Sequence, residues 1–313
     1  MKQIILDDGQ IQDFTGVGIF TALRDFCLVR HKVTISPLDL SANTNLQLLQ
    51  IEGENTSCGV GSININGCTE LEQLHLRTNH LTALDLSTNS KLTKIYCDNN
   101  QLTTLDLSGC PNVKQVYCFQ NQITGEGMDN LIANLPTRAA SDGVMSIVNS
   151  NAEAEGNSMT TLQVAAAKEK GWATYNWAGG LYAGVKVDPA LAYAEAVVYA
   201  KMGEPFTAPE LTNPYGVAPA YSSSDANIAS VDAATGTVTL LKEGATTITA
   251  TYAEDDIYTA SQASYKLIVE EVNGIIQSTT NSQQPTTTYN LHGQRVGRNY
   301  RGIVLINGKK VKK

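Results

Sequence analysis

Apolar residues recur along this chain at a fixed spacing of 21 residues. Three ten-residue segments align on one another: LEQLHLRTNH (71–80), LTKIYCDNNQ (92–101) and VKQVYCFQNQ (113–122). Two apolar positions and a closing asparagine coincide in all three, as Leu74/Ile95/Val116, Leu76/Cys97/Cys118 and Asn79/Asn100/Asn121. A unit of this length buries its apolar face only against the next unit, so the pattern predicts stacked parallel strands.

The residues that precede and connect these segments carry a second repeat with the spacing L-x-x-L-x-L-x-x-N/C. They are ISPLDLSAN (35–43), VGSININGC (60–68), LTALDLSTN (81–89) and LTTLDLSGC (102–110). The first turn is irregular, because LQLLQIEGEN (46–55) begins 25 residues before Leu71. Over residues 35–123 the pattern resembles leucine-rich repeats, in the short form found in surface proteins of Gram-negative anaerobes. The resemblance implies a solenoid with a binding role.

The segments on either side of these repeats follow different patterns. Residues 1–34 contain few repeat anchors, and we interpret them as an N-terminal cap over the exposed end of the stack. After Asn121 the chain alternates between helix-type and strand-type patterns, at 127–136, 143–150, 160–171 and 172–177. We predict that these elements form larger turns of the same sheet, so that the solenoid spans residues 35–184.

The sequence pattern changes at Asp188-Pro189. From there on, short runs of alternating apolar and polar residues predict β-strands, and clusters of turn-forming residues separate them. Residues 221–269 resemble the bacterial immunoglobulin-like group 2 domain. The matching pieces are Ser222-Ser223-Ser224, Ile228-Ala229-Ser230-Val231, Thr235-Gly236-Thr237-Val238, Gly244 and Tyr258. We place this all-β module at 185–272, and the resemblance implies a spacer or stalk.

The C-terminal end is polar and then basic. Residues 273–288 have a linker composition, and residues 289–313 contain two strand-like runs with Asn307-Gly308 as a hairpin turn. This short β tail resembles the C-terminal sorting tails of secreted proteins from the same anaerobes. Its net charge is +7, which leaves −15 for the remainder of a chain whose net charge is −8. The basic end has two open readings, a solvated terminus or a surface-attachment element.

Six cysteines occur without any C-x-x-C pair, which gives no support to zinc-ribbon or thioredoxin-type sites. Cys97 and Cys118 occupy an inward position of the repeat. Neighbouring parallel strands seldom bring Cβ atoms into bridging geometry, so we expect buried thiols rather than disulfides.

The outward positions of the stacked strands carry the candidate binding residues. Side chains alternate across a strand, so the outward columns should contain His75, Arg77, Tyr96, Asp98, Tyr117 and Phe119. Aromatic rings beside an arginine are typical of recognition hot spots, but stacked aromatics also stabilise sheets through cross-strand packing. The opposite face carries Asp39, Asn64, Asp85 and Asp106 in one column. That column favours turns bonded to backbone amides over a cation site.

Composition narrows the class of protein. The acidic net charge argues against nucleic acid as a partner, and no apolar run approaches the ~20 residues of a membrane span. Met1-Lys2 is followed by QIILDDGQ, which lacks the apolar core of a signal peptide, so for an exported protein we expect the signal to have preceded this sequence. No nucleophile elbow, zincin, P-loop or dinucleotide motif is present.

Together these features predict an α/β leucine-rich-repeat solenoid followed by an all-β immunoglobulin-like sandwich. We expect a non-catalytic adhesion protein without metal or cofactor, a monomer that binds an extracellular protein through the solenoid face. The alternative is a carbohydrate-binding accessory protein of a glycan-uptake system. The expected location is extracellular or the outer surface of a Gram-negative bacterium.

Overall fold

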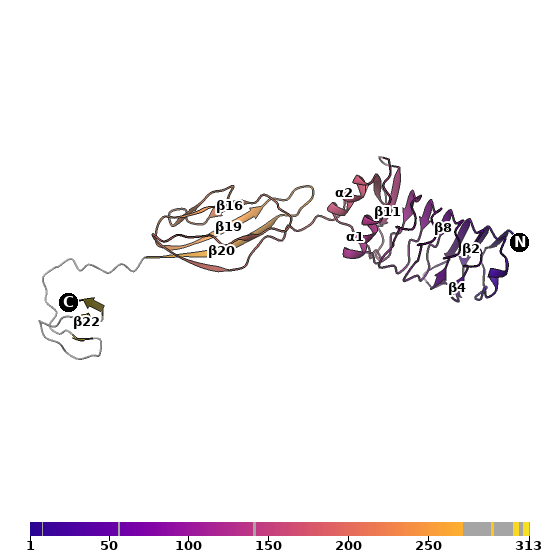
Figure 1. The fold of residues 1–313 in the computed structure, drawn as a ribbon, viewed down its shortest axis with the longest axis horizontal. Coiled ribbons are helices and arrows are strands. Elements are labelled where there is room, and N and C mark those ends of the chain that lie inside the picture. Colours follow the sequence, from indigo (N-terminus) through magenta and orange to yellow (C-terminus); the bar gives the residue numbers. More distant parts are fainter. Residues whose placement is uncertain are drawn as a thin grey trace.

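The computed structural model describes residues 1–7, 9–55, 57–139 and 142–271, and the backbone of 289–290, 303–306 and 309–312. The described chain is mostly β, with two short α-helices and one 3-10 helix. Figure 1 shows two bodies arranged end to end, with the N-terminus at the far end of the first.

The first body is built on a sheet of eight parallel strands that follow one another in chain order. They are β1 (Gln3–Asp7), β2 (Asp25–His31), β5 (Leu48–Gly53), β8 (Gln73–His75), β9 (Lys94–Tyr96), β10 (Gln115–Tyr117), β11 (Gly143–Val148) and β12 (Trp172–Asn176). Gln73 pairs with Lys94, and Lys94 with Gln115, so each of these turns advances by 21 residues. The register of residues 71–122 therefore confirms the predicted stack of parallel strands.

A second set of short strands pairs away from this sheet. β3 (Thr34–Ile35) pairs with β6 (Gly59–Val60), and β4 (Leu38–Asp39) pairs with β7 (Ile63–Asn64), both in parallel. Between the two sides lies the core, in which Leu74, Ile95 and Val116 are in register and fully buried. Cys97 and Cys118 are also buried in it, and both are free thiols.

Buried asparagines close each turn of the stack. The Nδ2 of Asn100 donates to the carbonyls of Leu76 and Cys97, while its Oδ1 accepts the amide of Leu81 at 3.0 Å. Asn79 and Asn121 make the equivalent bonds one turn earlier and one turn later. Backbone groups that the sharp turn leaves unpaired are thus satisfied inside the core, where an unmade hydrogen bond is costly.

The N-terminal segment differs from the prediction. We predicted a cap at residues 1–34, but this segment also contributes two strands to the sheet. β1 pairs with β2, with Ile4 opposite Phe26 and Leu6 opposite Leu28. The connection between them contains η1 (Val17–Ile19) rather than a second repeat row. The segment is therefore a divergent turn, and the repeat spacing could not reveal it because its apolar residues follow no 21-residue register.

The C-terminal turns of the first body are larger and contain the α-helices. α1 (Gly125–Ala133) precedes β11, and α2 (Thr161–Glu169) precedes β12. Thr160 and Gln163 form the capping box of α2, each side chain bonding the backbone amide of the other residue. These turns match the predicted alternation of helix and strand, with the ends of α1 displaced by a few residues.

The second body is a set of small antiparallel and mixed sheets. The largest contains β14 (Val197–Lys201), β20 (Ser261–Glu270), β19 (Gly244–Tyr252) and β16 (Ala220–Ser223), in that order. β14 and β20 pair in parallel, whereas the other neighbours are antiparallel. The remaining pairs are β13 (Ala192–Tyr193) with β15 (Leu211–Thr212), and β17 (Ala229–Val231) with β18 (Val238–Leu240). Its small core includes Ala229, Ile248 and Leu267.

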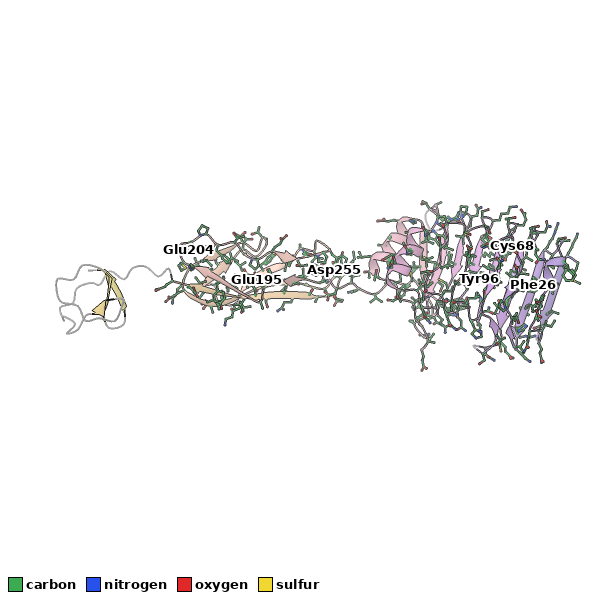
Figure 2. The ribbon with its side chains drawn as sticks, turned by 60° about the horizontal axis from the view of Figure 1, so that its bottom comes forward. Phe26, Cys68, Tyr96, Glu195, Glu204 and Asp255 are labelled. Atoms are coloured by element: carbon green, nitrogen blue, oxygen red, sulfur yellow. The ribbon has the colours of Figure 1, made fainter. Side chains whose placement is uncertain are left out.

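A loop of the second body touches the end of the first. The hydroxyl of Thr161 donates to the carbonyl of Ile257, and Lys186 pairs with Glu254 at 2.6 Å. Val187 forms an isolated parallel bridge to Tyr258. In Figure 2, Asp255 lies at the end of the second body that faces the stack, and Glu204 lies at the opposite end.

The described part of the C-terminal end forms a three-stranded antiparallel sheet of β21 (Tyr289–Asn290), β22 (Ile303–Ile306) and β23 (Lys309–Lys312). The proposed linker at 273–288 and the Asn307-Gly308 turn lie outside the described residues.

Candidate binding surface

The outer face of β8, β9 and β10 carries a continuous strip of aromatic rings. Strand pairing puts His75, Tyr96 and Tyr117 side by side. The ring centroids of His75 and Tyr96 are 4.6 Å apart, and those of Tyr96 and Tyr117 are 4.7 Å apart with nearly parallel planes. The strip follows from the 21-residue repeat, because one outward position is occupied by a ring in three successive turns.

Trp177 extends this strip, and the sequence did not reveal its role. It follows β12 directly, with its indole stacked on Phe119 at 4.8 Å and meeting Tyr117 edge-on at 6.0 Å. Half of the Trp177 side chain remains exposed. The sequence does place Trp177 at the end of the strand-type run WATYNW. However, β10 and β11 are 29 residues apart instead of 21, so the repeat could not predict that Trp177 lies beside Phe119.

Arg77 lies beside the strip and links it to a buried carboxylate. Its guanidinium carbon is 4.4 Å from the centre of the Tyr96 ring, a cation–π contact. Its Nε lies 3.2 Å from Oδ1 of Asp98. Burial raises the pKa of Asp98 to about 6, although the charge of Arg77 opposes this shift. The pair fixes the guanidinium against Tyr96, so the cation forms part of the surface.

Two of the predicted surface residues are in fact buried. Asp98 is 7% exposed and Phe119 is 5% exposed. Simple alternation placed both outward, but Arg77 pairs with the Asp98 carboxylate and Trp177 stacks over the Phe119 ring. We therefore correct the contact surface to His75, Arg77, Tyr96, Tyr117 and Trp177, with Asp98 and Phe119 as the groups that hold it.

The neutral form of His75 is favoured on this surface. Burial lowers the pKa of its imidazole, and Glu52 opposes the shift while Arg77 and Lys94 add to it. The hydroxyl of Tyr96 donates to Oε1 of Gln115 at 3.2 Å. Burial likewise raises the pKa of Tyr96. Both rings are therefore uncharged near neutral pH, and Arg77 provides the charge of the strip.

The stacking determines which part of each ring a ligand can reach. The face of Tyr96 is covered by Tyr117 on one side and by Arg77 and His75 on the other. The tyrosines consequently present ring edges and hydroxyl groups outward rather than open faces. Such an edge surface suits side chains of a protein partner, since a sugar ring stacks on an aromatic face.

The aspartate column on the opposite side of the stack forms turns. The Oδ1 atoms of Asp39, Asp85 and Asp106 each accept the backbone amide two residues further on, from Ser41, Ser87 and Ser108. Asn64 does the same in its own turn. The backbone bond from serine is the main reason for the lowered pKa of Asp39 and of Asp85. The turn interpretation is therefore confirmed, since one oxygen of each of these carboxylates is bonded to its own loop.

A polar groove of about 440 Å³ lies past the carboxyl ends of the same strands. It runs along Asn99, Gln101, Gln120 and Gln122 and ends at Glu155. The Glu155 carboxylate accepts the amides of Gln120, Asn149 and Asn157. In the regular turns, the equivalent backbone amides donate to carbonyls of the next turn. Glu155 accepts these hydrogen bonds where no further short turn follows, so the groove lies where the regular repeat ends.

No group of three or more His, Cys, Asp or Glu side chains is arranged to hold a metal ion in the part of the chain that the structure describes. Among the described helices, none is long and apolar enough to cross a membrane.

Comparison with known proteins identifies one module. Residues 212–257 match the model of the bacterial Ig-like domain (group 2). No curated protein matches the chain. Among solved structures, the chain is similar to the functional domain of InlJ from Listeria monocytogenes, described as including a cysteine ladder. The sequence identity is 14%, the alignment covers 86% of this chain and 81% of that one, and the TM-score is 0.24.

Proposed function

We propose that the protein is a non-catalytic binding protein of the cell surface. In this proposal the stacked turns are a leucine-rich-repeat solenoid that contacts a protein ligand, and the Ig-like module is a spacer. The location would be extracellular or the outer surface of a Gram-negative bacterium, which the sequence patterns of the repeats and the tail support.

The observation that carries the proposal is the aromatic strip with its fixed arginine. Four rings and a guanidinium lie at contact distance on an open sheet face. Aromatic and arginine side chains dominate the energetics of protein interfaces. The ring edges and hydroxyls presented by Tyr96 and Tyr117 favour a protein ligand over a sugar.

A second candidate is carbohydrate binding, and Trp177 is the observation in its favour. Its indole is half exposed while the other side packs on Phe119, so it offers a stacking area that the tyrosines lack. In that case Trp177 would be the central contact and the tyrosine strip would serve to stabilise the sheet.

Parallel screening of the full chain against a glycan array and a panel of extracellular matrix proteins tests both candidates. Tyr96→Ala combined with Tyr117→Ala should weaken binding of a protein ligand at least thirtyfold, which corresponds to about 2 kcal/mol. Because the two rings stack, this double variant also loses stability, and Tyr117→Phe keeps the stack while removing one outward hydroxyl. Tyr199→Ala in the second body is the matched control, since Tyr199 is 65% exposed and outside the strip.

The salt dependence of binding and the effects of single substitutions distinguish a protein ligand from a glycan. A protein ligand should bind more weakly at high salt and to Arg77→Gln. A glycan should tolerate both changes and lose binding with Trp177→Ala. If the tyrosine double variant and Trp177→Ala both bind every ligand as well as the wild type, the strip is sheet packing and the proposal fails.

A further inference from the structure

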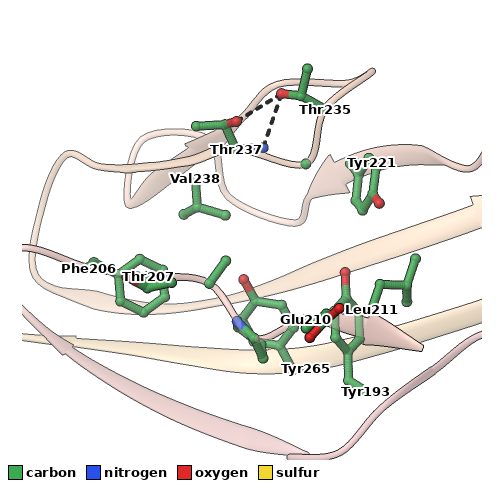
Figure 3. Close-up of a pocket in the computed structure, with 13 residues that line it drawn as sticks. Tyr193, Phe206, Thr207, Glu210, Leu211, Tyr221, Thr235, Thr237, Val238 and Tyr265 are labelled. Atoms are coloured by element: carbon green, nitrogen blue, oxygen red, sulfur yellow. Dashed lines mark hydrogen bonds between the residues drawn. The ribbon is translucent and has the colours of Figure 1, made fainter. Parts of the chain in front are cut away.

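The second body contains a pocket of about 400 Å³ whose lining includes four aromatic side chains. Its rings are Tyr193, Phe206, Tyr221 and Tyr265, contributed by elements far apart in the sequence. Figure 3 shows Tyr193 and Tyr265 pointing from the lower strands toward Tyr221 and the turn at 235–238. The centroids of Tyr193 and Tyr265 are 4.9 Å apart in an edge-to-face arrangement. The volume lies within the range of small-ligand sites.

The floor of the pocket has an unmet hydrogen bond. Tyr265 is 1% exposed, and its hydroxyl has no hydrogen-bond partner among the described residues. Burial and the neighbouring Tyr193 raise the pKa of Tyr265 to about 12, so the group is a neutral hydroxyl. A buried hydroxyl without a partner costs roughly 1–3 kcal/mol. Native structures usually retain such a group for a reason other than stability.

The backbone holds one wall of the pocket in place. Gly236 has a φ of 73°, and a Cβ there would lie 2.8 Å from the Tyr221 ring. The missing side chain lets the turn approach Tyr221 closely. Phe206 and Tyr221 also line the pocket and are only half-buried, and a ligand that reaches the buried hydroxyl of Tyr265 requires lining side chains to change rotamer.

The electrostatic setting favours a cation. The lining residues include the exposed carboxylate Glu210 but no Lys, Arg or His. Within the described chain no ion pair involves Glu210. Residues 185–271 contain twelve Asp and Glu against four Lys. Aromatic faces attract cations, and a carboxylate at the mouth adds to that attraction.

We propose that this pocket binds a primary alkylammonium group, such as the end of a lysine side chain. The rings surround the cation, Glu210 pairs with it, and the Tyr265 hydroxyl accepts one of its N–H bonds. A quaternary ammonium has no N–H to donate and leaves that hydroxyl unpaired. The site is independent of the aromatic strip on the first body.

The test uses the full chain and ligand-observed NMR with N-acetyl-lysine methylamide as the probe. The neutral analogue N-acetyl-norleucine methylamide and the trimethyllysine derivative are the comparison ligands. Saturable binding of the lysine probe at concentrations up to about 10 mM is expected, at least threefold tighter than either comparison ligand. Absence of saturation, or equal binding of the trimethyl derivative, overturns the proposal.

Two conservative variants locate the site. Tyr265→Phe and Glu210→Gln should each weaken the lysine probe at least threefold, whereas Tyr199→Phe and Glu204→Gln should bind it as the wild type does. Tyr265→Phe removes an unpaired buried hydroxyl, so its Tm should equal or exceed that of the wild type. Wild-type affinity in both pocket variants would place the cation elsewhere.

Discussion

Replacement of Asp98 by asparagine should make the first body more stable at neutral pH, although it removes one partner of an ion pair. Asp98 is almost fully buried, and burial raises its pKa from the usual 3.8 to about 6 even beside Arg77. The free-energy cost of desolvating the ionised carboxylate in the folded state therefore exceeds the stabilisation that it gains from the charge of Arg77. Asparagine keeps the shape of the protonated acid and never ionises.

The sign and size of the effect follow from the pKa change. Between pH 3.8 and pH 6 the folded chain holds a proton on Asp98 that the unfolded chain has lost, so Asp98 lowers stability as the pH rises through this interval. A shift of about two pKa units corresponds to about 3 kcal/mol at 1.36 kcal/mol per unit. The variant should match the wild type near pH 4 and exceed it by about 2–3 kcal/mol above pH 6.5.

Urea unfolding followed by tryptophan fluorescence measures this difference in one body only. The two tryptophans, Trp172 and Trp177, both lie in the first body. The quantity of interest is the variant-minus-wild-type free energy of unfolding at several pH values from 4 to 7.5. Groups that titrate alike in both proteins cancel in that difference.

Asp85→Asn provides a control of opposite sign. Hydrogen bonds from Ser87 and Asn66 lower the pKa of Asp85, so its carboxylate adds stability above pH 3.8 and loses that contribution as the pH falls. The Asp85 variant should therefore be the less stable protein at pH 7.5. A free-energy difference for Asp98→Asn that does not change with pH, or a loss of stability at pH 7.5, would refute the reasoning.

Two further predictions concern the core of the stack. Cys97 and Cys118 should remain reduced and unreactive toward thiol reagents until the chain unfolds, because both are fully buried; fewer than six free thiols in denaturing, non-reducing buffer would show a bridge. Asn100→Ala should cost about 2 kcal/mol or more in urea unfolding, since it leaves the Leu81 amide and the Leu76 carbonyl unpaired inside the protein. The exposed Gln122→Ala should change stability by no more than about 0.5 kcal/mol, and an equal loss in both variants would contradict the role assigned to Asn100.

The sequence predicted those parts of the molecule that depend on local periodicity. Leu74, Ile95 and Val116 are in register because the same spacing that aligns the letters also aligns the strands. The helices at 125–133 and 161–169 followed from their own apolar patterns and, for the second, from the Thr160 cap. The Ig-like resemblance in residues 221–269 agrees with the family match at 212–257.

The parts that the sequence did not predict depend on contacts between turns of unequal length. Trp177 reaches Phe119 across two long turns, a pairing that no fixed repeat encodes. Alternation alone placed Asp98 outward, while its actual burial depends on the side chain of Arg77 from the preceding turn. The pocket beside Tyr265 is assembled from segments between residues 193 and 265 that are far apart in the chain, so no single local pattern indicates it.

The parallel pairing of β14 with β20 has a mechanical consequence. Five consecutive pairs, from Val197 with Lys266 to Lys201 with Glu270, join the first long strand of the Ig-like module to its last. Because the two strands run in the same direction, tension that pulls on the start of β14 and the end of β20 shears all of these hydrogen bonds together. An antiparallel terminal pair would instead be peeled open one bond at a time. Unfolding under force depends on the rate of crossing such a barrier. The hydrogen bonds between β14 and β20 therefore resist together a pull applied at the two ends of the module.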